Sequence, residues 1–78
     1  MTKQNENQGF GAGWQQLRLV DTAPAKAEIM KILGVTTEAS FRNYRMGRLV
    51  PDRIEAEQIE HVFHNYGVRQ NIWGAAEA

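Results

Sequence analysis

Cysteine is absent from this 78-residue chain. Its absence excludes a disulfide framework, a cysteine-based zinc site and thiol catalysis, and it favours an intracellular setting. Long apolar runs are also absent, because no stretch approaches the roughly 18 residues that a transmembrane helix needs. The opening stretch "MTKQNENQGFGAG" lacks the apolar core of a signal peptide. We therefore expect a cytoplasmic protein that does not enter a membrane.

An excess of charge of either sign is missing too, since nine basic and nine acidic residues give a net charge of zero. The distribution is uneven. Six cations and three anions lie from Lys26 to Arg53, whereas "IEAEQIE", which follows, carries three anions and no cation. A polyanion responds to local potential more than to the total, so the basic middle of the chain is compatible with nucleic acid.

Patterns typical of enzymes are not found. The sequence offers no Ser/His/Asp arrangement and no carboxylate pair in an apolar setting, so we expect no catalysis, no cofactor and no small-molecule substrate. His61 and His64 lie three apart near Glu57 and Glu60. A metal site would need a third well-placed ligand and supporting hydrogen bonds. Glu–His pairs on a polar helix face are the simpler interpretation, and we expect no metal.

The domain organisation follows from composition. Residues 1–13 are polar and then glycine-rich, which predicts a flexible tail. Within this tail, "GFGAG" lacks the preceding strand and the following Lys-Ser/Thr of a phosphate-binding loop, so we interpret it as a linker. Residues 14–74 are expected to form one domain, and residues 75–78 are expected to fray.

Helical spacing and end signals predict an all-α fold, a compact bundle of four to five short helices. A first short helix is expected in "WQQLRLV". A second is expected in "DTAPAKAEIMKILG", capped by Asp21 or Thr22 and ended by Gly34. A third is expected from about Thr37 to Met46 with Thr36 or Thr37 as its cap, and a last one in "DRIEAEQIEHVFHNY". Val68, Ile72 and Trp73 are expected to fold back onto the core.

The second and third helices would form a helix-turn-helix. Its inward side chains are predicted to be apolar or aromatic: Ile29, Leu33, Val35, Phe41 and Tyr44. At roughly 100° per residue, Ala39, Arg42, Asn43 and Met46 then face outward. Arginines on a short helix are often no more than a solvated face, whereas a protruding helix of this width also fits the major groove of B-DNA.

Four pieces in order, "EIMKILGVT", "FRNYRMG", Pro51 and "IEHVFHNYGV", resemble the phage-repressor and Cro-type (Xre-like) helix-turn-helix family. The resemblance covers about residues 24–74. It implies a small bacterial DNA-binding protein that regulates transcription, in the setting of a mobile element or phage remnant. It also implies that a Leu-Gly-Val turn opens the recognition helix and that Gly47 closes it.

Within that reading, residue chemistry assigns the contacts. Arg42 and Asn43 suit guanine and adenine edges, and Ala39 and Met46 suit a thymine methyl group. Contacts to phosphate are expected from Lys26, Thr36, Thr37, Arg45 and Arg48. A homodimer would suit two-fold related half-sites. The alternative is a protein-interaction module, an adaptor or a toxin-neutralising partner, which the zero net charge and the acidic "IEAEQIE" favour.

Overall fold

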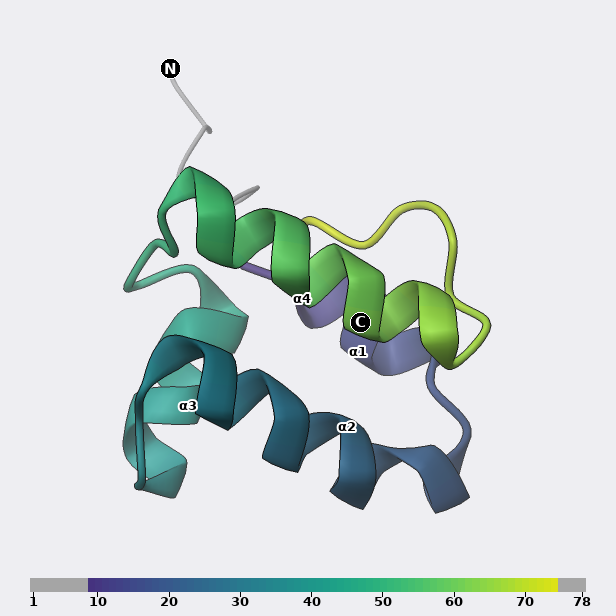
Figure 1. Cartoon of the computed structure of the whole chain (residues 1–78), viewed down its shortest axis with the longest axis horizontal. Helices are drawn as coiled ribbons and strands as arrows, with labels where there is room; N and C mark the ends of the chain where they lie inside the picture. The colour runs from purple at the N-terminus through teal and green to yellow at the C-terminus, as the bar shows by residue number, and fades with distance from the viewer. Residues whose placement is uncertain (1–8, 75–78) are drawn as a thin grey trace.

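The computed structural model describes residues 9–74, which form four helices and no strand: α1 (Gly11–Gln16), α2 (Leu19–Leu33), α3 (Glu38–Met46) and α4 (Arg53–Asn65). α2 and α4 pack side by side in opposite directions, and α3 lies across one end of this pair (Figure 1). α1 lies behind α4 in this view (Figure 1), and it packs against α3. The all-α prediction is confirmed. Among the described residues, no helix is both long and apolar enough to cross a membrane.

Local signals set several helix ends: the roles of Thr37, Gly34 and Gly47 are as predicted, whereas the capping box of α4 was not predicted. The Thr37 side chain accepts a hydrogen bond from the Ser40 N–H, which caps the start of α3. Gly34 and Gly47 adopt left-handed backbone with φ of 71° and 89°, and they end α2 and α3. α4 begins with a capping box in which Asp52 and Glu55 each accept the other's N–H, at 2.8 and 3.0 Å.

The predicted start of α2 is wrong. The helix begins at Leu19, with Arg18 rather than Asp21 or Thr22 at the cap position. Asp21 lies in the first turn and accepts a hydrogen bond from Arg18 Nε at 3.0 Å. Leu19 and Val20 are 88% and 73% exposed, so the first turn of α2 carries no buried apolar stripe that could mark it in the sequence.

The core contains the expected stripes and one unexpected residue. Ile29 and Phe41 are buried, as predicted, and Ile59 and Phe63 of α4 are buried with them. Phe10 is fully buried among them, although the sequence placed it in a tail. Its ring centroid lies 5.6 to 6.5 Å from those of four other aromatic residues, Trp14, Phe41, Phe63 and Trp73. The expected tail is therefore wrong for residues 9–13, while residues 1–8 and 75–78 lie outside the described part of the chain.

The C-terminal segment, residues 66–74, closes the fold around α1. The N–H groups of Ala12 and Gly13 donate to the carbonyls of Gly74 and Ile72, both at 2.9 Å. Gln16 Nε2 donates to the carbonyls of residues 70 and 71, both at 3.1 Å. No side chain caps α1, so these carbonyls satisfy donors that a helix start leaves open. The predicted return of Val68 and Ile72 to the core is confirmed.

Tyr66, at the beginning of the C-terminal segment, is hydrogen-bonded to α2: its hydroxyl donates to Glu28 Oε2 at 2.6 Å. This bond to Glu28, followed by desolvation and by the charges of Glu28 and Asp21, raises the pKa of Tyr66 above its ordinary value of 10.0. In the pH range between the ordinary and the raised pKa, the Tyr66 hydroxyl loses its proton in the unfolded chain and keeps it in the folded chain. The free energy of unfolding should therefore fall as the pH rises through this window.

We expect Glu28→Ala to lower the pKa of Tyr66 towards its ordinary value and to reduce the loss of stability above about pH 10. Ultraviolet absorbance of the phenolate measures the titration, and a Tyr44→Phe background leaves Tyr66 as the only tyrosine. An unchanged Tyr66 titration in Glu28→Ala would contradict this assignment of the hydrogen bond.

Candidate nucleic-acid interface

α3 presents two different faces. Phe41 is 1% exposed and holds the inner face against the core, with Tyr44 half-buried beside it. On the opposite face Ala39 and Arg42 are exposed and Met46 is 51% exposed. The orientation predicted for these residues is confirmed.

Asn43 departs in part from this prediction because it is half-buried. At roughly 100° per residue, Asn43 lies about 160° from Phe41 and so points to the outer side of α3, which means that its reduced exposure comes from neighbouring residues rather than from its direction. Along the helix axis, the fully exposed part of the outer face therefore has Arg42 at its centre, with the smaller or apolar Ala39 and Met46 about one turn away on either side. Such a face offers one strong hydrogen-bonding group flanked by methyl-sized contacts.

The two ends of α3 also carry exposed polar residues. Thr36 and Thr37 are exposed at its start, and Arg48 is exposed just beyond its last turn. The Thr37 hydroxyl donates to Ser40 Oγ at 3.0 Å in addition to accepting from the Ser40 N–H, so its first role is to fix the helix start. The exposed helix start adds backbone N–H groups that could meet an anion.

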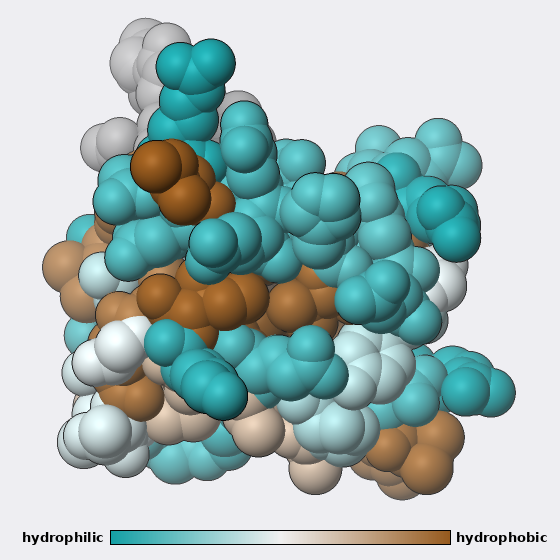
Figure 2. All heavy atoms as spheres, viewed as in Figure 1, coloured by the Kyte–Doolittle hydropathy of each residue, from teal (hydrophilic) through white to brown (hydrophobic). Residues whose placement is uncertain are grey.

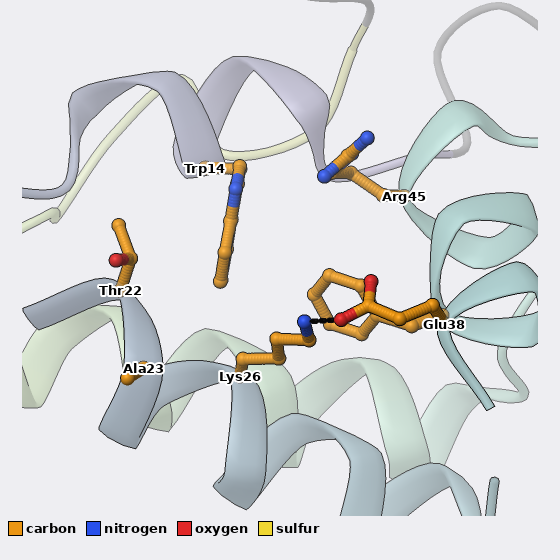
Figure 3. A pocket seen from close by; sticks show the side chains of 7 residues that line it. Trp14, Thr22, Ala23, Lys26, Glu38 and Arg45 are labelled. Atoms are coloured by element: carbon orange, nitrogen blue, oxygen red, sulfur yellow. Dashed lines mark ion pairs between the residues drawn. The ribbon is translucent and has the colours of Figure 1, made fainter. Parts of the chain in front are cut away.

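Lys26 and Arg45, two predicted phosphate contacts, lie on the side of α3 that faces α1 and α2. Lys26 forms an ion pair with Glu38 (Figure 3). Both cations also lie over the Phe41 ring, with Lys26 Nζ 5.7 Å and Arg45 Cζ 5.9 Å from its centroid. Their contact with phosphate stays a prediction.

Two surface features were missed by reasoning from the sequence. One is a cavity of about 370 Å³ between α1, α2 and α3, to which Trp14, Lys26 and Arg45 contribute. Its walls come from distant parts of the chain, so no local pattern could reveal it. The other is apolar surface at the beginnings of α2 and α4 (Figure 2). Near α4 the exposed apolar side chains are 44% to 67% accessible and belong to Leu49, Val50 and Ile54.

The histidine pair on α4 has its rings 6.2 Å apart. Within residues 9–74, no group of three or more histidine, cysteine, aspartate or glutamate side chains is placed to hold a metal ion. Glu60 instead accepts a hydrogen bond from the Trp73 indole N–H at 2.6 Å, so one of the nearby carboxylates holds the C-terminal segment.

Comparison with protein-family models, with curated proteins and with solved structures gives no match to this chain. The molecule is an all-α domain in which a four-residue turn joins α2 to α3. Its function is inferred below from the exposed face of α3 and from the charges around it.

Proposed function

We propose that this protein binds double-stranded DNA in a sequence-specific manner and regulates transcription, with α3 in the major groove. The observation that supports this most is the free outer face of α3. Arg42 is exposed at its centre and has no ion-pair partner within residues 9–74. Phe41 anchors the helix from behind, so this face is held in a fixed orientation, which direct recognition of bases requires.

Each exposed group has a matching partner on DNA. Arg42 can donate two hydrogen bonds to guanine, and Ala39 and Met46 can contact a thymine methyl group. Asn43, whose side chain is half-buried, can pair with adenine. Arg48 and the start of α3, with Thr36 and Thr37, supply phosphate contacts, and Lys26 and Arg45 lie at the flank.

Glu38 would repel phosphates at the start of α3 if it were unpaired. Its ion pair with Lys26 reduces that repulsion, since the positive charge lies directly beside the carboxylate. The pairing therefore weakens the main electrostatic objection to placing this end of α3 near the DNA backbone. A homodimer with two copies of α3 would fit two-fold related half-sites.

The decisive experiment is binding of the chain to a random-sequence duplex library at several salt concentrations. Each neutralised phosphate contributes about −0.9 to the slope of log K against log salt, so three to five contacts predict a slope of roughly −3 to −5. Selected sequences should share a short motif. Absence of binding at low salt would overturn the proposal.

Arg42→Ala and Arg48→Ala should both weaken DNA binding, but in different ways. Loss of Arg42 should cost roughly 1–3 kcal/mol of binding free energy on the selected site and relax the preference at one base pair. Loss of Arg48 should weaken all sequences alike and reduce the salt slope by about one. Arg69→Ala, in the C-terminal segment, is the control and should bind as the parent does. The same salt-insensitive behaviour of both variants would contradict these roles.

The exposed apolar side chains after α3 favour a second candidate, a protein-interaction module. Leu49, Val50 and Ile54 are 44%, 54% and 67% exposed, and a partner protein could bury them. This candidate predicts a protein that copurifies in stoichiometric amount and is lost in Ile54→Asp. It also predicts no DNA shift at low salt, which separates it from the first proposal.

A further inference from the structure

The cavity between α1, α2 and α3 has the size of a small-molecule site. Its volume of about 370 Å³ falls in the range of about 300–1,000 Å³ typical of ligand pockets. In Figure 3 the Trp14 ring points into the space between α1 and α2, opposite the Lys26–Glu38 ion pair. A ligand here would touch three helices, including the proposed recognition helix.

The cavity carries a net positive charge. Lys26 and Arg45 contribute two cations and Glu38 one carboxylate. Glu38 is paired with Lys26, whereas the Arg45 guanidinium has no carboxylate partner within residues 9–74 and lies over the Phe41 ring. An Arg guanidinium binds a planar carboxylate through two parallel hydrogen bonds. The guanidinium of Arg45 could therefore bind the carboxylate of a ligand in this cavity.

The remaining walls favour an aromatic ligand. Trp14 is half-buried and meets Phe41 edge to face, with ring centroids 5.1 Å apart and planes at 69°. This packing orients the indole, and aromatic rings attract further rings in edge-to-face or offset arrangements. Small side chains, Thr22 and Ala23, line the side towards α2 and leave room beside it.

From these features we infer that the cavity binds a small planar aromatic carboxylate. The carboxylate would bind Arg45 and compete with Glu38 for Lys26, while the ring packs against Trp14. The inference goes beyond the proposed function, because binding in the cavity does not require DNA. Since the same cations lie beside α3, such a ligand would be an effector if the proposed function holds.

The test is an NMR titration of ¹⁵N-labelled protein with benzoate and indole-3-acetate, each compared with its neutral amide. The indole N–H signal of Trp14, assigned with Trp14→Phe, should shift saturably, while that of Trp73 stays in place. Probes this small should give dissociation constants on the order of 1 mM. The amides should bind at least about tenfold more weakly, because they lack the charge that Arg45 recognises.

Two variants separate binding in the cavity from non-specific attraction of the anion to the charged protein surface. Arg45→Gln should weaken carboxylate binding about tenfold or more. Glu38→Gln should strengthen it about two- to fivefold, because it removes the competitor for Lys26. Arg69→Gln is the control and should leave binding unchanged, and an unmoved Trp73 signal shows that each variant is folded. Equal binding of acid and amide, equal affinity of Arg45→Gln and the parent, or no saturable shift would each overturn the inference. None of these results depends on DNA binding, which the library experiment tests separately.

Discussion

Replacing Phe10 by alanine is expected to lower the free energy of unfolding by about 3–5 kcal/mol, which is most of the stability of a domain this small. The side chain is fully buried, and four aromatic rings surround it. Alanine would lose the transfer free energy of the ring and would leave a cavity where α1, α3, α4 and the C-terminal segment meet. Urea unfolding followed by circular dichroism measures the change.

Ile54→Ala is the matched control for Phe10→Ala. It also truncates a large apolar side chain to alanine, but Ile54 is 67% exposed. We expect its free energy of unfolding to lie within about 0.5 kcal/mol of the parent. If Phe10→Ala were as stable as Ile54→Ala, Phe10 would not contribute to the core and the fold described above would be wrong at its centre.

Gly9→Ala is expected to destabilise the domain by about 3 kcal/mol, the upper end of the usual cost of overpacking. A Cβ on Gly9 would lie 2.2 Å from the Arg45 carbonyl oxygen and 2.5 Å from the Gly47 nitrogen. Both are backbone atoms at the end of α3, so neither can move aside as a flexible side chain can. The segment before α1 would have to separate from α3.

Gly34→Ala is the comparison, because at Gly34 a side chain has space but the backbone conformation disfavours it. A Cβ there would meet no atom within 4 Å, but the backbone has a φ of +71°. Left-handed backbone costs a non-glycine residue roughly 1–2 kcal/mol. Chemical unfolding should therefore rank Gly9→Ala as more damaging than Gly34→Ala, and the reverse order would contradict the close contact at Gly9.

Local signals explain which parts of the fold could be predicted. α3 and α4 have side-chain caps at their starts, α3 ends at a glycine, and both carry apolar residues at helical spacing, all readable within a few positions. The two faces of α3 follow from Phe41 and Tyr44 alone. "GFGAG" was misread because its glycines look like those of a linker, whereas Gly9 is small to fit α3 and Phe10 fills the core. Both reasons depend on residues more than 30 positions away.

For the candidate site too, the features that depend on one helix could be predicted, and those that depend on packing between helices could not. Residues on the outer face of α3 were identified because one helix decides their orientation. Lys26 and Arg45 were assigned to phosphate by their charge and, for Lys26, by the family resemblance. Their position beside Trp14 depends on how α1 packs on α3, which leaves no periodic trace in the sequence. Leu49, Val50 and Ile54 became informative only when the structure showed that nothing within the described residues covers them.

The carbonyls of Ile72 and Gly74 that hold the start of α1 have a consequence for biosynthesis. During translation, α1 and Phe10 emerge long before the residues that complete their surroundings. Three of the rings around Phe10 come from positions 14, 41 and 63, but Trp73 and the carbonyls of Ile72 and Gly74 come last, so the surroundings of Phe10 stay incomplete until this segment has left the ribosome. We therefore expect this domain to complete its folding late in synthesis, and we expect a chain that stalls on the ribosome after α4 to expose part of this aromatic cluster to chaperones and proteases.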